Sequence, residues 1–276
     1  MNDHAGIGSI GLYTNLDRIA NGLAELGLGP ADPIAPEQLF SLDQWHYHGT
    51  AAIRAAAEAL DVKPESRVLE IGSGIGGPAR YLAHAIGCHV TALELQPEVH
   101  AIAADLTRRC GLDGRVTHLC GDALSYPIPD AAFDAVVSWL SVLHIPDRPR
   151  LLTRLARALR AGGGCYIEDF SERAPFAATD LKDLREIVFG ITVTSIREYM
   201  DDLRAAGFVD IDATDLTDQW TPFVTERVKA WRENQTAYVR AHGEDAYADQ
   251  ERFYAAVARL FESGNLGGVR VAAHVP

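Results

Sequence analysis

The chain has 276 residues and a hydrophobic share of 47%, enough for one large or two modest folded domains. Its formal net charge of −13 argues against a nucleic-acid partner, because binding a polyanion needs concentrated Lys and Arg. The four cysteines are spaced neither as a zinc site nor as a secreted disulfide scaffold. With no signal peptide and no apolar run of roughly 20 residues, the sequence predicts a cytoplasmic protein that does not enter a membrane.

An N-terminal helical extension and lid is expected over residues 1–63. Within it, residues 15–28 carry apolar side chains at helical spacing, and a Gly-Pro-Ala-Asp-Pro break follows. Aromatic and histidine residues then crowd together just before the next expected helix, as a segment that could order over a bound ligand: Trp45, His46, Tyr47 and His48.

From residue 64 onward, short apolar strands alternate with helical segments, a pattern typical of a parallel sheet built from βαβ units. We expect strands at Arg67 to Ile71, His89 to Leu93, Val116 to Cys120, Phe133 to Ser138 and Cys165 to Asp169. The helices between them are expected near 76–86, 97–110 and 148–160, the last stopped by glycines 162–164. Residues 64–214 therefore predict an α/β, Rossmann-like core with helices on both faces.

The C-terminal part departs from a dinucleotide-binding fold. A helix (195–206), a strand (208–216) and two amphipathic helices precede a final apolar strand at 268–275. If that strand returns antiparallel, the sheet has the seven-stranded order of methyltransferases. Residues 215–276 are thus expected to form a helical substrate cap plus the final strand.

The strongest local signal is a glycine-rich turn after the first strand, VLEIGSGIGG at residues 68–77. Glycine allows positive φ and close approach of the backbone to a ligand, so Gly72, Ser73 and Gly74 are candidate cofactor contacts. The glycines also satisfy the dinucleotide spacing G-x-G-x-x-G. The turn alone does not choose between cofactors.

Acids around the turn favour S-adenosylmethionine. Glu70 could receive the ammonium of a methionine moiety, whereas a carboxylate is unwelcome beside a pyrophosphate. Glu94 ends the second strand, where it could accept the ribose hydroxyls. Asp122 ends the third strand, where it could accept from the adenine amino group while Leu95 and Ala123 flank the ring.

Several segments resemble the successive motifs of class I methyltransferases: VLEIGSGIGGPARYLA, GDAL, FDAVVSW, VLHI and LRAGGG. Within that class, SLDQWHYHGTAAIRAAAEAL and GIGGPARYLA resemble sarcosine/dimethylglycine and phosphoethanolamine N-methyltransferases. The resemblance implies cofactor contacts from Gly72, Gly74, Glu94, Leu95, Asp122, Ala123 and Ser138. It also implies that Tyr47 and His48 close over the methionine end.

By the same resemblance, His144 aligns with a histidine that helps to hold and deprotonate an amine, and an imidazole has a suitable pKa for that role. Two departures indicate a more apolar acceptor than a phosphorylated amine: Trp139 and Leu140 replace an arginine and an aspartate, and residues 188–191 replace a basic and tyrosine cluster. Aromatic residues that could surround the acceptor are Tyr13, Trp45, Trp139, Phe170, Phe189 and Trp220.

Two chemical interpretations follow. In the first, the acceptor is an amine nitrogen or another heteroatom of a small molecule. In the second, an alkene carbon of a prenyl diphosphate is methylated, Glu168 at the end of the fifth strand removes the proton, and Mg²⁺ or arginines such as Arg173, Arg185 and Arg197 hold the diphosphate. Intact motifs disfavour a noncatalytic partner subunit. The sequence leaves open the acceptor, the number of transfers, a metal requirement and the oligomeric state.

Overall fold

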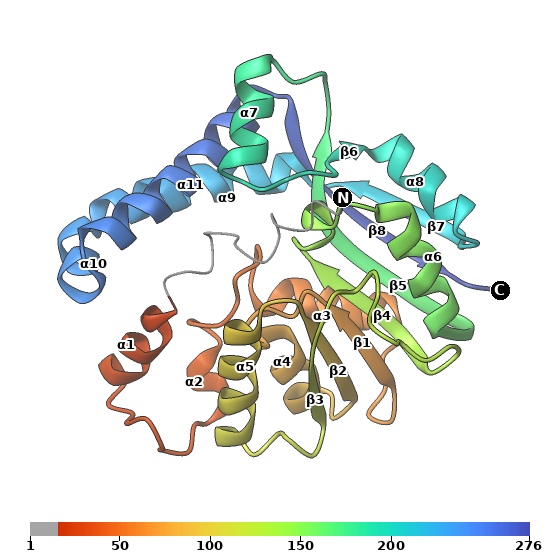
Figure 1. Ribbon diagram of the computed structural model, residues 1–276, viewed down its shortest axis with the longest axis horizontal. Helices are drawn as coiled ribbons and strands as arrows, with labels where there is room; N and C mark the ends of the chain where they lie inside the picture. Colours follow the sequence, from red (N-terminus) through yellow and green to blue (C-terminus); the bar gives the residue numbers. More distant parts are fainter. Residues whose placement is uncertain (1–15) are drawn as a thin grey trace.

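A central, mostly parallel sheet organises the chain in the computed structural model, which describes residues 16–276 (Figure 1). Tyr13, a predicted substrate contact, therefore lies outside the described residues. The strands run in the order β3-β2-β1-β4-β5-β8-β7, and β6 pairs with β5. Their bounds are β1 Arg67–Ile71, β2 His89–Glu94, β3 Val116–Cys120, β4 Phe133–Trp139, β5 Leu159–Glu172, β6 Thr194–Ser195, β7 Val209–Asp215 and β8 Leu266–His274.

The antiparallel return of the last strand, predicted from the sequence, is confirmed. β8 pairs antiparallel with β5, from Gly164 opposite His274 to Glu172 opposite Leu266, and antiparallel with β7 on its other side. The remaining strand pairs of the sheet are parallel. The sheet is thus the expected Rossmann-like one with its final strand reversed.

β5 is much longer than the strand expected at Cys165 to Asp169. It already pairs with β4 at Leu159, continues through Gly162 to Gly164, and follows β8 to Glu172. A Cβ at residue 164 would lie 2.7 Å from Leu60 Cδ2, so any larger residue there would have to displace the Leu60 side chain. The glycine run was therefore misinterpreted as only a helix stop, when it also lets β5 pass close beside α3.

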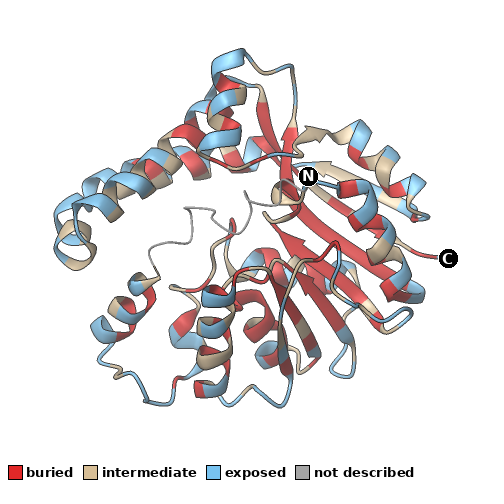
Figure 2. Cartoon of the chain, viewed as in Figure 1, coloured by how far each residue is buried: buried red, intermediate tan, exposed pale blue. Residues whose placement is uncertain are grey.

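Helices cover both faces of the sheet. On one face α3 (Thr50–Ala59) and α4 (Gly77–Ala85) pack against Val68, Val90 and Ala92. On the other face α6 (Arg148–Ala158) and α8 (Ile196–Ala205) pack against Leu69 and Ile71. Each fully buried aliphatic side chain stabilises the fold by about 1.5–3 kcal/mol. Figure 2 shows the resulting band of buried residues along the strands.

Except for α5, which packs against β2 and β3, the remaining helices lie toward the carboxyl ends of the parallel strands. α7 (Ala178–Glu186), α9 (Thr217–Glu233), α10 (Gln235–His242) and α11 (Glu244–Glu262), together called the cap, project on the same side as α1 (Asp17–Glu25) and α2 (Pro36–Leu39) (Figure 1). Asn21 Nδ2 of α1 donates to the Ala241 carbonyl of α10 at 3.0 Å, so the two parts meet. α5 (Pro97–Arg109) packs on α1 and α2.

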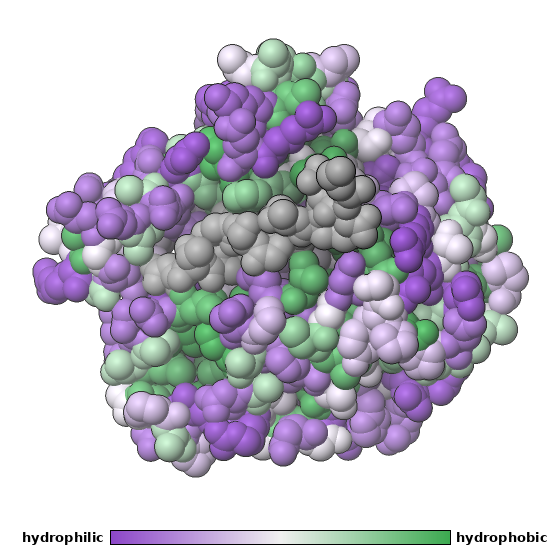
Figure 3. All heavy atoms as spheres, in the orientation of Figure 1, coloured by the Kyte–Doolittle hydropathy of each residue, from purple (hydrophilic) through white to green (hydrophobic). Residues whose placement is uncertain are grey.

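The cap packs on β5 and β8 through an apolar cluster in which Trp220, Val257 and Leu260 are almost fully buried, together with Phe170 and Leu266. On the face shown in Figure 3, hydrophilic residues predominate, and hydrophobic residues gather between the cap and the part that holds the sheet. Over residues 16–276, no helix combines the length and apolarity needed to cross a bilayer.

Candidate cofactor and acceptor site

The glycine turn between β1 and α4 lies against the segment that follows β4. Gly72 has φ +66° and Gly74 has φ +53°, a region that favours glycine. A Cβ at Gly72 would lie only 1.7 Å from Ser141 Oγ, so no other residue fits there without displacing that segment. The turn therefore offers bare backbone at the carboxyl ends of β1 and β4, where open α/β sheets bind ligands.

Two predicted acids end their strands beside this turn. Glu94 is 8% exposed, and its two carboxylate oxygens accept from the backbone N–H groups of Gly74 (2.9 Å) and Gln96 (3.0 Å). Burial raises the pKa of Glu94, although these N–H groups oppose the shift. Asp122 accepts from the Leu124 N–H at 2.8 Å. Leu95 and Ala123 are their immediate neighbours, so the structure brings the predicted ribose and adenine contacts to one edge of the sheet.

Two buried polar atoms beside the turn have no hydrogen-bond partner among residues 16–276. They are Glu70 Oε2, on a side chain that is 2% exposed, and Ser73 Oγ, on one that is 4% exposed. Burial raises the pKa of Glu70 to about 8. Orphaned buried groups are costly unless a ligand satisfies them, and a carboxylate oxygen suits an ammonium group. Ser138, by contrast, donates to the Ile71 carbonyl at 3.0 Å and helps to fix β1 against β4.

Residues 42–49, the lid segment, are attached firmly to the core. Asp43 and Arg80 form an ion pair at 2.9 Å in which each side chain is 1% exposed. The Trp45 ring lies 3.8 Å from where a Cβ of Gly74 would stand. The rings of Tyr47 and His48 lie 5.1 and 4.9 Å from Phe223 of the cap, and His48 is exposed. The lid segment thus runs from the glycine turn to the cap, and its contact with a cofactor stays a prediction.

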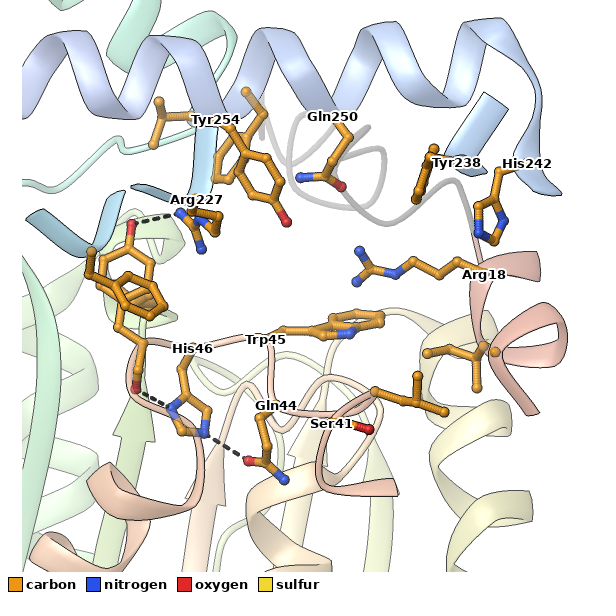
Figure 4. A pocket seen from close by; sticks show the side chains of 18 of the residues that line it. Arg18, Ser41, Gln44, Trp45, His46, Arg227, Tyr238, His242, Gln250 and Tyr254 are labelled. Carbon is orange, nitrogen blue, oxygen red and sulfur yellow. Dashed lines mark hydrogen bonds between the residues drawn. The ribbon is translucent and has the colours of Figure 1, made fainter. Parts of the chain in front are cut away.

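A cavity of about 400 Å³ lies between the lid segment, the turn after β4 and the cap (Figure 4). Its described lining is rich in aromatic rings, including Trp45, Tyr47, Phe170, Phe223, Phe253 and Tyr254. Two arginines, Arg18 and Arg227, and a single acid, Glu25, also belong to this described lining. A mainly apolar space with a few convergent polar groups is typical of a small-molecule site.

His144 lines this cavity from the short helix η3 (Val142–His144), directly after the segment that touches Gly72. Its Nδ1 lies 2.9 Å from the Phe189 carbonyl, which can only accept, so Nδ1 carries the proton. The neutral ring then keeps a lone pair on Nε2. Burial lowers the pKa of His144, which favours this neutral form near pH 7.

Glu168 is placed differently. Its Oε1 accepts from the Tyr166 hydroxyl at 2.7 Å, and Glu168 is not among the described residues that line the cavity. Burial raises its pKa. Asp169 is buried on the opposite face of β5, where burial raises its pKa to about 7. Of the two predicted catalytic residues, only His144 faces the cavity.

Some of the aromatic residues predicted to contact the acceptor line the cavity, and others do not. Trp45 and Phe170 line the cavity. Trp139 instead stacks on His46 at 5.5 Å, Trp220 packs against Gly268 and Tyr47, and Phe189 contributes its carbonyl to His144. These three were predicted as aromatic rings that could surround the acceptor, and none of them belongs to the described lining of the cavity.

Sequence reasoning missed Arg227 and Ser141. Arg227 lies on α9 between Val224 and Val228, both buried, so a basic residue beside an apolar stripe was the available signal. Nothing in the sequence indicates a role for Ser141, whose side chain lies against Gly72 and leaves no room for a Cβ there.

Comparison with known proteins agrees with this geometry. The family model described as "Methyltransferase domain" matches residues 68–163. The 27-O-demethylrifamycin SV methyltransferase of Amycolatopsis mediterranei is 33% identical over 192 residues, covering 67% of this chain and 70% of that protein. The sarcosine/dimethylglycine N-methyltransferase of Halorhodospira halochloris is 29% identical over 214 residues, covering 78% and 76%.

Other relatives are longer. Phosphoethanolamine N-methyltransferase 1 of Arabidopsis thaliana is 29% identical over 203 residues, which are 73% of this chain but only 40% of the plant protein. The solved structure of Haemonchus contortus phosphoethanolamine N-methyltransferase 2 with S-adenosyl-L-methionine superposes with a TM-score of 0.79 at 23% identity, covering 87% of this chain and 56% of the other. The chain thus spans only part of the length of these relatives.

The sheet order and the site define a Rossmann-like enzyme that binds its ligand at the carboxyl ends of parallel strands. The matched family model and relatives make the assignment specific. The chain belongs to the class I S-adenosylmethionine-dependent methyltransferases.

Proposed function

We propose that this chain methylates a proton-bearing heteroatom, in the first place an amine nitrogen, of a small molecule that enters the aromatic-lined cavity. The observation that carries the proposal is the placement of His144, which lines the cavity and is held by the Phe189 carbonyl at 2.9 Å. Relatives named as sarcosine/dimethylglycine and phosphoethanolamine N-methyltransferases support nitrogen.

In this proposal the residues around the glycine turn bind the cofactor. Glu70 and Ser73 take its ammonium group, Glu94 takes the ribose hydroxyls, and Asp122 takes the adenine amino group. When bound, S-adenosylmethionine supplies the methyl group on its sulfonium. The division into an extension and lid (1–63), a core (64–214) and a helical part with the last strand (215–276) belongs to the same proposal, although α7, within the core range, pairs with Arg259 of α11 and so belongs to the cap.

The protein's part in the reaction is to position the acceptor and to move one proton. Holding two reactants in line supplies much of the acceleration in a displacement reaction. An amine must expose its lone pair, and an N–H proton must leave. His144 Nε2 accepts this proton, while the Nδ1–H bond to Phe189 fixes the ring orientation. The apolar lining excludes water that would compete as an acceptor.

We do not propose methylation of an alkene carbon. Glu168, the base that this chemistry would use, points its Oε1 at the Tyr166 hydroxyl. Arg173 faces Asp215 at 3.7 Å, and Arg185 and Arg197 are exposed. None of these three arginines is among the described lining of the cavity. The proposal therefore requires no Mg²⁺.

The test is a screen of methyl acceptors with paired variants. Purified protein is given S-adenosylmethionine and panels of amines, phenols, alcohols and prenyl diphosphates, and methylated product is identified by mass spectrometry. With the best amine, His144→Ala should lower kcat by about 10²–10⁴-fold, the usual loss for a positioned base, and Glu168→Gln should lower it far less. Since burial lowers the pKa of His144, the acid limb of the kcat/KM profile should lie below its ordinary value of 6.5.

Calorimetry with S-adenosylhomocysteine serves as the control, because both variants should bind it as the unchanged protein does. Methylation of prenyl diphosphates alone, with Glu168→Gln as the crippling change, would refute the proposal. So would an unchanged kcat for His144→Ala.

A further inference from the structure

Arg227 is a cation in the cavity that has no counter-ion among the described residues. Figure 4 shows its side chain reaching from α9 beside Tyr254, on the far side of the cavity from Trp45. One nitrogen, Nη2, donates to the Tyr47 hydroxyl at 3.3 Å, while Nε is buried and has no hydrogen-bond partner in the described part of the chain. No carboxylate of residues 16–276 forms an ion pair with it, whereas Arg232 on the same helix contacts Glu251 at 2.7 Å.

Aromatic rings hold this guanidinium in place. Its carbon lies 4.3 Å from the ring centre of Tyr254, 4.7 Å from that of Tyr47 and 5.5 Å from that of Phe223. Cation–π attraction to several rings orients the group but leaves N–H donors unused. A guanidinium has five donors in a planar fork that matches the two oxygens of a carboxylate or phosphate.

The charge around Arg227 also favours an anion. Although the chain has a net charge of −13, Glu25 is the single acid in the described lining of the cavity. Glu25 lies on α1, at the end of the cavity where α1 meets α10, whereas Arg227 lies on α9. No acid of the described lining forms an ion pair with Arg227, so none occupies the place of a bound anion there. A partly buried charge is costly when unpaired, so a ligand that supplies an oxyanion here gains the interaction.

We propose that Arg227, together with the Tyr47 hydroxyl, binds a carboxylate or phosphate group of the methyl acceptor and so selects acidic amines over neutral ones. This inference rests on the proposed function and names an acidic substrate class for it, in place of the more apolar acceptor that Trp139, Leu140 and residues 188–191 indicate in the sequence. The same chemistry could come from the methionine carboxylate of the cofactor. The place of Arg227 on the cap, rather than on the glycine turn with Glu70 and Ser73, favours the acceptor.

The experiment uses the full chain saturated with S-adenosylhomocysteine and measures binding of three probes by calorimetry: benzoate, phenyl phosphate and the neutral benzamide. The unchanged protein should bind both anions at least about tenfold more tightly than benzamide, because charge-assisted hydrogen bonds are roughly twice as strong as neutral ones. Arg227→Gln should abolish this preference, and Arg227→Lys should keep part of it, since a point charge lacks the planar fork.

Arg232→Gln is the matched control, because it removes the same charge from the same helix outside the cavity, and it should keep the full preference. Equal binding of benzoate and benzamide by the unchanged protein, or no benzoate binding at all, overturns the proposal. So does a preference that survives in Arg227→Gln. If Arg227→Gln instead weakens S-adenosylhomocysteine about tenfold while the anion preference stays, the carboxylate is the cofactor's and the proposal is wrong.

These results stand apart from the proposed function, because the binding probes require no methyl transfer. A protein that prefers anions but methylates no amine would overturn the proposed function alone. Thermal melting of each variant checks folding. If Arg227→Gln fails to fold, the anion preference of Arg227→Lys is compared with that of the unchanged protein, and an undiminished preference overturns the proposal.

Discussion

The ion pair between Asp43 and Arg80 fixes the lid segment to the core, and replacing Asp43 by Asn tests how strongly. Asp43 Oδ2 accepts from both Nε (3.3 Å) and Nη2 (2.9 Å) of Arg80, and both side chains are 1% exposed. Asparagine keeps the shape and one acceptor but removes the negative charge. Arg80 would then be a buried cation whose hydrogen-bond partners among residues 16–276 are all neutral: the asparagine oxygen, the Thr107 hydroxyl and the Ala103 carbonyl.

Breaking a buried pair by removing one partner costs about 3–5 kcal/mol, because an uncompensated charge remains. The asparagine retains part of the hydrogen bonding, so we expect Asp43→Asn to lower the free energy of unfolding by about 3 kcal/mol. Burial raises the pKa of Asp43 even though Arg80 opposes the shift. Desolvation thus offsets much of the attraction, and the double variant D43L/R80M should recover most of the loss.

Urea unfolding followed by circular dichroism measures these differences. The matched control is Asp134→Asn, which breaks the ion pair between Asp134 and Arg160 at 2.8 Å. The side chains of Asp134 and Arg160 are 35% and 47% exposed, so this variant should lower the free energy of unfolding by at most about 1 kcal/mol. A loss for Asp43→Asn no larger than that of the control would refute the reasoning. Loss of stability in D43L/R80M equal to that in Asp43→Asn would refute the argument about desolvation.

Two further predictions concern the cofactor. Glu94→Ala should weaken S-adenosylhomocysteine by about 1–3 kcal/mol in calorimetry, because the ribose hydroxyls lose a buried acceptor, and unchanged affinity would contradict the role assigned to it. Since burial raises the pKa of Glu70 to about 8, the free protein holds a proton there at pH 7. An incoming ammonium favours the ionised form, so binding should release a proton and tighten as the pH rises toward that value. Calorimetry in buffers of different ionisation enthalpy should detect this release, and its persistence in Glu70→Gln would reject the assignment.

The strand order and the glycine turn could be predicted because their signals are local. A buried parallel strand is a short apolar run, and a glycine with positive φ follows it directly, as at Ile71 and Gly72. Residues 34–43 carried no such signal. Ile34 and Leu39 are buried against Val99 and Leu106, and the Asp43 carbonyl lies 2.2 Å from where a Cβ of Gly77 would stand. The spacing of apolar residues in 34–43 does not indicate that Ile34 and Leu39 pack against α1 and α5.

The candidate site shows the same limit. His144 was selected by its resemblance to a histidine of related N-methyltransferases, and its position on η3, shortly after β4, places it in the lining of the cavity. Glu168 was expected at the end of the fifth strand, but β5 continues to Glu172. The Tyr166 hydroxyl, two residues before it on the same face, donates to its carboxylate. Arg227 could not be selected from the sequence, because it stands out only by having no carboxylate partner among the described residues. Whether residues of different helices form an ion pair depends on the fold and leaves no pattern in the sequence.

The charge of the cavity bears directly on the proposed chemistry. Methyl transfer needs the amine in its neutral form, and an ammonium ion entering a space whose described lining holds Arg18, Arg227 and one glutamate meets net repulsion. The same cations attract the acidic group of an amino acid or phosphorylated amine. Such an acceptor would therefore be held by its anion while the pKa of its nitrogen is lowered. Burial also lowers the pKa of His144, which keeps the imidazole free to accept the proton and lets it pass that proton on to solvent afterwards. The arginines that line the cavity would thus both attract the acidic group of the substrate and favour the neutral form of its amine.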